Sequence, residues 1–164
     1  MDEPLAFRIG HSNRAHVIVS ASHAPVASPS RRERPRVIDY WDDNWVEVDI
    51  EIAAGAFRGA FPATVRTDEV LRFRDQLRPL YEKLTGRAVF DPMESWLRIE
   101  VEGDGKGHFH ASCKADDHPG IGNKLAFTVD FDQTELPAIL KGLDAICEAF
   151  PVVGSPTGEK RSRV

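Results

Sequence analysis

Two clusters of polar residues in this sequence have the composition and spacing of chemically active groups. In the first, His108 and His110 are two residues apart, so that on one strand both imidazoles could approach a single metal ion. Asp116, Asp117 and His118 follow shortly afterwards. A structural zinc site needs about four ligands at a recognisable spacing, which this cluster lacks. Histidines on the solvent side of a strand explain the pattern better, and we predict neither a metal nor a cofactor.

The second cluster is acidic and could include the paired carboxylates of a glycosidase. Its members are Glu47, Asp49, Glu51, Glu100 and Glu102. Such pairs normally lie in a cleft, whereas carboxylates on an open sheet face usually serve solvation. The glycine-rich segment 103–107 superficially resembles a phosphate loop, but it is predicted to join two strands and no Lys-Ser/Thr pair follows it. We therefore predict that the protein is not an enzyme.

The strands that would carry these side chains are marked by alternation. Over 45–52, aliphatic residues alternate with acids, which predicts a strand with one buried face. The same alternation over 57–65 predicts its antiparallel partner. Three more strands are predicted over 94–102, 107–115 and 124–132, with connections rich in glycine. The turn sequences between them indicate antiparallel pairing.

Two helices and a less regular hairpin complete the predicted fold. Apolar residues recur at helical spacing over 67–84 and again over 134–150. Segments 5–10 and 15–20 could form an N-terminal hairpin. The resulting order, (β-β)-β-β-α-β-β-β-α, predicts an α+β fold in which an antiparallel sheet of five to seven strands has both helices packed on one face.

The length and composition favour one soluble domain. We predict a single α+β domain over 1–151, interrupted by a flexible Ser/Pro/Arg-rich loop at about 22–36 and followed by a disordered basic tail over 152–164. No apolar run is long enough to cross a bilayer, and the N-terminus is acidic rather than basic and then apolar. These features predict a cytoplasmic protein without a membrane partner.

The charge is divided unevenly along the chain. Segment 37–151 contains 22 acidic and 12 basic residues, a net charge of −10, whereas the two ends together have a net charge of +5. An acidic domain repels nucleic acid and attracts basic partners. The alternative explanation is that the acidity only keeps the protein soluble.

The tryptophans give this acidic surface its candidate binding site. In an unbroken strand Trp45 shares a face with Glu47, and Trp96 shares one with Glu100, in both cases away from the core. Tryptophan is over-represented among the residues that dominate binding energy at interfaces. The alternative is that a bulge at 42–44 reverses the phase and buries Trp45; Trp41 is expected to be structural. The predicted partner-binding residues are Trp45, Glu47, Asp49, Glu51, Trp96, Glu100, Glu102, His108 and His110.

Four segments together resemble the WapI-like immunity proteins. They are DYWDDNWVEVDIEI, LRFRDQLRPLYEKL, SWLRIEVEGDGKGHFH and DQTELPAILKGLDAICEAFP, within 37–151. The most specific part is the W-D-x-N-W signature at 41–45. The resemblance implies an immunity-type protein that binds and neutralises the toxic C-terminal domain of a cognate contact-dependent toxin. Such a toxin domain would be basic if it binds an acidic face. The competing prediction is a small-molecule or peptide-binding module that uses a groove between sheet and helices.

Overall fold

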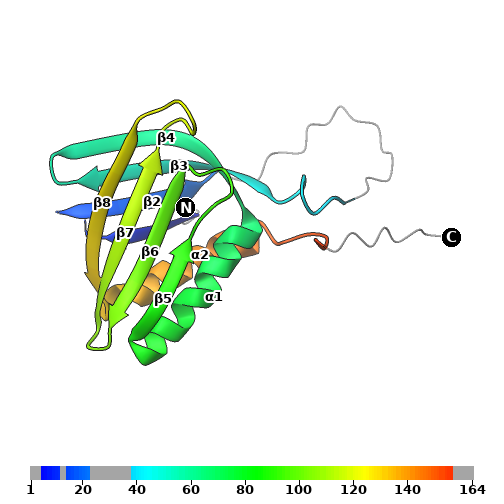
Figure 1. The fold of residues 1–164 in the computed structure, drawn as a ribbon. Helices are drawn as coiled ribbons and strands as arrows, with labels where there is room; N and C mark the ends of the chain where they lie inside the picture. Colours follow the sequence, from blue (N-terminus) through cyan, green and yellow to red (C-terminus); the bar gives the residue numbers. More distant parts are fainter. Residues whose placement is uncertain (1–4, 12–13, 23–37, 157–164) are drawn as a thin grey trace.

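Two four-stranded antiparallel sheets face each other across one hydrophobic core (Figure 1). The computed structural model describes residues 5–11, 14–22 and 38–156. The predicted loop at 22–36 therefore falls, after its first residue, outside the described residues, as does 157–164 of the predicted tail. The first sheet has the strand order β1-β2-β3-β4, formed by β1 (Ala6–Gly10), β2 (Ala15–Ala21), β3 (Trp45–Ala54) and β4 (Phe57–Arg66).

The second sheet has the order β5-β6-β7-β8, and all its neighbouring strands are antiparallel. It is formed by β5 (Thr85–Phe90), β6 (Leu97–Asp104), β7 (His108–Asp116) and β8 (Lys124–Asp132). Helix α1 (Thr67–Lys83) connects the two sheets. A short 3-10 turn, η1 (Gln133–Glu135), leads from β8 into helix α2 (Leu136–Ala149).

The predicted alternation correctly identifies the buried face of the strands. In β3 the aliphatic residues Val46, Val48, Ile50 and Ile52 are buried, and the acids between them are exposed. In β6 and β7, Leu97, Ile99 and Val101 and then Phe109, Ala111 and Cys113 point inward in the same way. Burial raises the pKa of the Cys113 thiol to about 12. Each sheet thus contributes one apolar face to the shared core.

The helices fill the open side of the two sheets. Helix α1 packs along β5, α2 packs along β1, and the helices also contact each other (Figure 1). Phe73 of α1 lies at the centre of this junction, with ring centroids 6.0 Å from Phe7 of β1 and 5.6 Å from Phe90 of β5. The helices therefore join the outer strands of the two sheets. Among the described residues, no helix is long and apolar enough to span a membrane.

The predicted α+β class and the two helices are confirmed, but the predicted arrangement of a single sheet is wrong. Eight described strands form two sheets, and the helices lie at their edges instead of covering one face. Strand β5 was missed, because the predicted order places no strand between the first helix and the strand at 94–102. In the structure, Leu84 turns the chain with φ 63° and Gly86 continues it with φ 119°, so that β5 begins at Thr85 and runs back beside α1.

Close packing of α2 on β1 depends on a glycine in the helix. A Cβ atom at Gly142 would clash with the carbonyl oxygen of Ala6 and would lie 3.0 Å from the Cα of Phe7. Both obstacles are backbone atoms, which cannot move aside as a flexible side chain can. The absence of a side chain at this position sets the distance between the helix and the sheet.

We predict that Gly142→Ala lowers the free energy of unfolding by about 2 kcal/mol, because overpacking against backbone outweighs the gain in helix propensity of about 1 kcal/mol. Chemical denaturation would measure the change. Gly59→Ala is the matched control, because a Cβ at Gly59 would have no atom within 4 Å. A Gly142→Ala protein as stable as wild type would show that α2 does not depend on this close approach.

Candidate functional site

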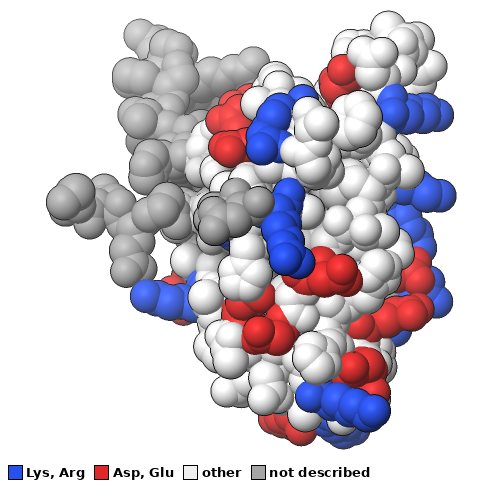
Figure 2. Space-filling model, turned by 90° about the vertical axis from the view of Figure 1, so that its left-hand side faces the viewer, with Lys and Arg blue, Asp and Glu red and all other residues white. Residues whose placement is uncertain are grey.

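The predicted binding residues divide between the two sheets. Trp45 and the acids of β3 lie on the first sheet, whereas the remaining members belong to β6 and β7 or precede β6. Figure 2 shows acidic and basic groups interspersed over the side of the molecule that it displays. The single acidic face predicted from the sequence is therefore replaced by separate groups of carboxylates, which differ in their surroundings.

The first group, which we call the β3 column, consists of Glu47, Asp49 and Glu51. These side chains are exposed at alternate positions of one strand. Their partners across the pairing with β4 are Thr64, Pro62 and Ala60, none of which is charged. Among the described residues the one ionic contact of the column is from Glu51 to His16, at 3.7 Å. The column is therefore a row of carboxylates without a compensating arginine or lysine in the described part of the chain.

Glu100 on the second sheet is in a different situation. Its carboxylate lies 2.7 Å from a guanidinium nitrogen of Arg87 and 3.0 Å from one of Arg98. Hydrogen bonds from Arg98 and Arg87 lower the pKa of the Glu100 carboxyl. Arg98 also contacts Asp91 at 2.7 Å. Glu100 is thus part of an ion-pair network, which already neutralises its charge.

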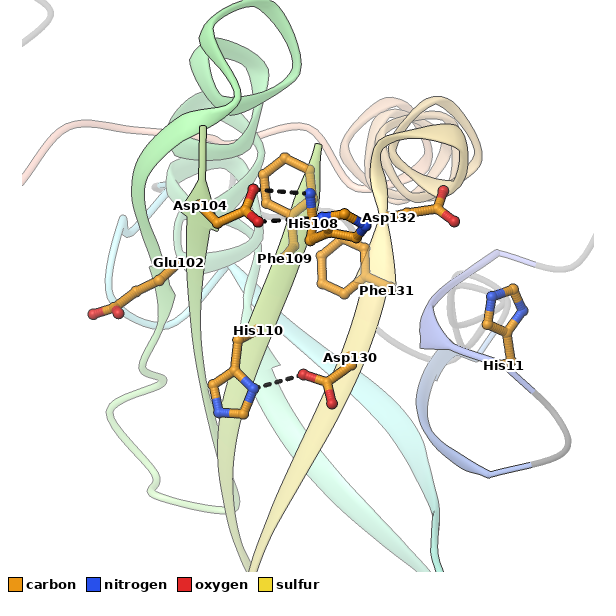
Figure 3. Close-up of a pocket in the computed structure, with 10 residues that line it drawn as sticks. His11, Glu102, Asp104, His108, Phe109, His110, Asp130, Phe131 and Asp132 are labelled. Atoms are coloured by element: carbon orange, nitrogen blue, oxygen red, sulfur yellow. Dashed lines mark hydrogen bonds and ion pairs between the residues drawn. The ribbon is translucent and has the colours of Figure 1, made fainter. Parts of the chain in front are cut away.

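Glu102, His108 and His110 come together at one end of the second sheet. They line an open hollow of about 590 Å³ (Figure 3). His110 Nδ1 is 2.6 Å from Asp130 Oδ1 of β8, and His108 Nδ1 is 3.2 Å from Asp104 Oδ2. The hollow's other polar side chains are absent from the predicted set; they are His11, Asp104, Asp130 and Asp132.

Two of these additional carboxylates are fixed by local hydrogen bonds. Asp104 accepts from the backbone N–H groups of Lys106 and His108, at 2.7 and 3.1 Å, and the first of these contributes most to lowering the pKa of its carboxyl. Asp132 accepts from the hydroxyl and the N–H of Thr134, which lower its pKa in the same way. The hollow is therefore negatively charged at neutral pH. Nowhere in the described part of the chain do three or more His, Cys, Asp or Glu side chains converge as a metal site would require.

Trp96 makes contacts between the sheets rather than with the carboxylates of β6. Its ring stacks on Phe61 of β4, with centroids 6.1 Å apart and planes inclined by 26°. The Trp96 and His118 ring centroids are 6.3 Å apart, with the ring planes nearly perpendicular. The indole is half-buried against the core, and its Nε1 lacks a hydrogen-bond partner among the described residues. Packing therefore accounts for this tryptophan.

The signature at 41–45 surrounds a buried arginine. The guanidinium carbon of Arg66 lies 4.9, 5.0 and 5.4 Å from the ring centroids of Tyr40, Trp41 and Trp45. Arg66 is 1% exposed. Its side chain donates hydrogen bonds to the carbonyls of Trp41 and Tyr40, at 2.6 and 2.9 Å, and to Asp68 at 2.9 Å. The buried charge is thus satisfied by two carbonyls, a carboxylate and three aromatic faces.

Asn44 connects the same segment to more distant parts of the chain. Its side-chain amide donates to the carbonyls of Tyr40 and Val153, and its amide oxygen accepts from the N–H of Val153. Its backbone carbonyl accepts from the N–H of Thr67, at the start of α1. We call the segment Tyr40–Trp45 together with Arg66 the arginine clasp. The clasp joins the beginning of β3, the end of β4, the start of α1 and the chain that follows α2.

The sequence left two alternatives for Trp45: an outward position beside the acids of β3, or burial caused by a bulge at 42–44. The structure has the outward position. Pairing of β3 with β4 is continuous from Trp45 opposite Arg66 to Ala54 opposite Phe57, so no bulge reverses the phase. Trp45 points outward with the β3 column and packs on Arg66. It is 37% exposed, and Trp41 is 51% exposed. Each indole therefore combines a structural contact with an accessible surface.

Comparison with known proteins identifies one family. The sequence profile described as the immunity protein WapI-like family matches residues 27–151. No curated protein matches the sequence. Among solved structures, a similar one is that of the plant transcriptional regulator PBF-2, with 14% sequence identity, a TM-score of 0.46, and coverage of 92% of this chain and 84% of that chain.

We predict that Arg66→Lys lowers the free energy of unfolding by about 2 kcal/mol or more, because an ammonium cannot reproduce the planar set of donors or the stacking of the guanidinium. Arg72→Lys is the control. Its side chain is 65% exposed and lies 3.8 Å from the same Asp68, so we expect a change within about 0.5 kcal/mol. Equal losses in the two variants would show that the clasp does not require a guanidinium.

We also predict that Asp132→Ala is less stable than wild type at neutral pH, because the side chain of Asp132 caps the turn that leads into α2. The folded state lowers the pKa of this carboxyl. Its contribution is therefore present above the ordinary pKa of about 3.9 and is lost as pH falls through the lower, folded-state value. Thermal unfolding at several pH values should show the two proteins converging in acid. A difference that stays constant below that range would contradict an ionised cap.

Proposed function

We propose a function from one established fact: this chain belongs to the immunity protein WapI-like family. In our proposal, it binds the toxic C-terminal domain of a cognate contact-dependent toxin and neutralises it by occupying the surface on which that domain acts. The activity is stoichiometric binding, without catalysis or a cofactor, and it takes place in the cytoplasm. The partner surface is basic.

The principal contact in this proposal is the β3 column together with Trp45. The observation that carries it is the presence of three exposed carboxylates on one strand, next to an accessible indole, with no described lysine or arginine neutralising them. Charged groups arranged in this way accelerate association with a positively charged partner. They would also disfavour nucleic acid as a ligand, because phosphates carry the same sign of charge.

The clasp would make Trp45 an efficient anchor. Its ring is already stacked over Arg66, with 5.4 Å between the guanidinium carbon and the ring centroid. An indole that is ordered before binding loses little side-chain entropy when a partner packs on its exposed side. Tryptophan is also enriched among the few residues that dominate binding energy at interfaces.

The remaining predicted residues contribute to different extents in this proposal. Glu102, His108 and His110 line the hollow on the second sheet and form a second acidic contact. Glu100 is already paired with two arginines, and Trp96 is engaged with Phe61. We therefore assign these last two residues a supporting role, in which they hold the strands that carry the others.

The competing function is binding of a small molecule or peptide in a groove between sheet and helices. An enclosed pocket of mixed polarity would favour that function. The hollow that contains Glu102, His108 and His110 is instead open to solvent, and it lies along β6, β7 and β8 beside the residue that follows β1, not between a sheet and the helices. A protein surface is better matched to such a shape than a small molecule is.

The direct test is production of the chain together with the C-terminal domain of a candidate contact-dependent toxin from the same genome. We expect a stable complex on gel filtration and protection of cells from growth arrest. If the toxin domain stays unbound and growth stops in the presence of the folded protein, the proposed function is wrong.

The assignment of the β3 column is tested separately by the triple variant Glu47→Gln, Asp49→Asn, Glu51→Gln. We expect at least about a ten-fold loss of affinity for the toxin domain, mostly in the association rate and greatest at low ionic strength. The control is Glu82→Gln, Glu94→Gln, Glu148→Gln, which changes the net charge equally at exposed positions elsewhere. Surface plasmon resonance measures both. The same loss of affinity in both triple variants would show that the effect comes from net charge and not from the β3 column.

A further inference from the structure

A second groove lies where the β3–β4 hairpin faces the connection from β7 to β8. Its volume is about 340 Å³. The lining comes from two chain segments that are far apart in sequence: Ile52 and 57–61 in the hairpin, and residues within 115–125 on the other side. None of them belongs to the predicted acidic site.

The groove contains unfilled space on the inward side of β4. Gly59 shares its face with Phe57 and Phe61 and pairs with the buried Ile52, so a side chain at this position would point toward the interior. A Cβ atom built there would nevertheless have no atom within 4 Å. The position therefore has room for an apolar group that the chain itself does not supply.

The groove is apolar and accessible. Phe57, at one end, is 63% exposed, and Phe61 and Leu125 are partly exposed beside the core. A large aromatic ring exposed beside an unfilled apolar space is a feature of interaction sites more than of solvated surface. Burial of these groups by a partner would be favourable.

The backbone beside the groove is available for pairing. Each of the four outer strands in the described sheets has a neighbouring strand on one side only; β1 and β5 are packed along helices, whereas β4 and β8 are not. An extended segment can add to such an edge through main-chain hydrogen bonds. Pro62 has no N–H, so continuous pairing with β4 is limited to Phe57–Phe61, which are the residues that line the groove.

The charge at the groove has the opposite sign to that of the domain. Arg58 donates hydrogen bonds to the carbonyls of Gly55 and Phe57, and no described carboxylate forms an ion pair with Arg58 or Lys124. Asp117, the acid in the lining, is bound by Asn123, whose backbone N–H contributes most to lowering the pKa of that carboxyl. Two unpaired cations therefore flank an apolar space within an acidic domain.

We propose that this groove binds an extended segment of a partner protein in which apolar residues alternate with acidic ones. An apolar side chain of that segment fills the space beside Gly59, its backbone pairs with β4, and a carboxylate pairs with Arg58 or Lys124. The proposal concerns a site different from the β3 column and requires the opposite charge in the ligand. It therefore stands or falls independently of toxin binding.

Short fluorescein-labelled peptides test it by fluorescence anisotropy on the full chain. One peptide alternates leucine with aspartate, and the other alternates leucine with lysine. We expect the Leu–Asp peptide to bind wild type and to lose at least about ten-fold in affinity with Gly59→Leu, which fills the space, and with Arg58→Gln combined with Lys124→Gln. The Leu–Lys peptide can bind the acidic surfaces, but that binding should not respond to Gly59→Leu.

Two controls separate occupancy of the groove from damage to the fold. Thr64→Leu adds the same side chain to β4 on its opposite face and should leave Leu–Asp binding unchanged. Phe57→Ala removes an exposed wall of the groove and should weaken binding, and it replaces Gly59→Leu if that variant unfolds at a lower temperature. Leu–Asp binding that is absent, or that persists in Gly59→Leu and Phe57→Ala, would overturn the proposal.

Self-association is a separate outcome. If sedimentation equilibrium shows dimers of the wild type that Gly59→Leu abolishes, the groove is occupied by a second copy of this chain. The assignment to a segment of another protein would then be wrong.

Discussion

A buried guanidinium determines how one corner of this protein is built. Arg66 ends β4 and immediately precedes α1, and its charge is removed from water beneath three aromatic rings. A charge in that position is tolerated only when its hydrogen-bond donors are satisfied, so Tyr40 and Trp41 must present their carbonyls to it. This requirement fixes the path of the chain into β3. Asn44 extends the same constraint to α1 and to Val153.

The clasp also links the fold to the proposed function. Trp45 contacts Arg66 with one side of its ring and remains accessible on the other, and the β3 column continues from it along the same strand. The aromatic anchor and the carboxylates are thus held in one register by ladder hydrogen bonds with β4. The second groove carries the opposite combination, in which an apolar space is flanked by Arg58 and Lys124. The two surfaces are suited to partners of different charge.

Most of the elements and the buried faces could be predicted from the sequence, and the sheet arrangement could not. Strands β3 and β7 each bury one face, so their alternation is the same whether the strands form one sheet or two. Strand β5 lacks a clear alternation because Thr85, Gly86 and Arg87 are all exposed, and only Ala88 and Phe90 are buried. The alternation of side chains along β3 likewise indicated that Trp45 points outward. It did not indicate that the ring of Trp96 would stack on Phe61 of the other sheet.

The sequence by itself determined the α+β class, the inward and outward faces of the strands, the acidic character of β3 and the family of the chain. These properties depend on residues that are close together in sequence, or on motifs that can be recognised in the sequence without its structure. The tertiary structure decided which charges are already neutralised, because the guanidinium of Arg87 on β5 reaches Glu100 on β6 only once the two strands are paired. It also decided that Arg66 is buried and that the space beside Gly59 is empty, since both depend on contacts between segments that are remote in sequence.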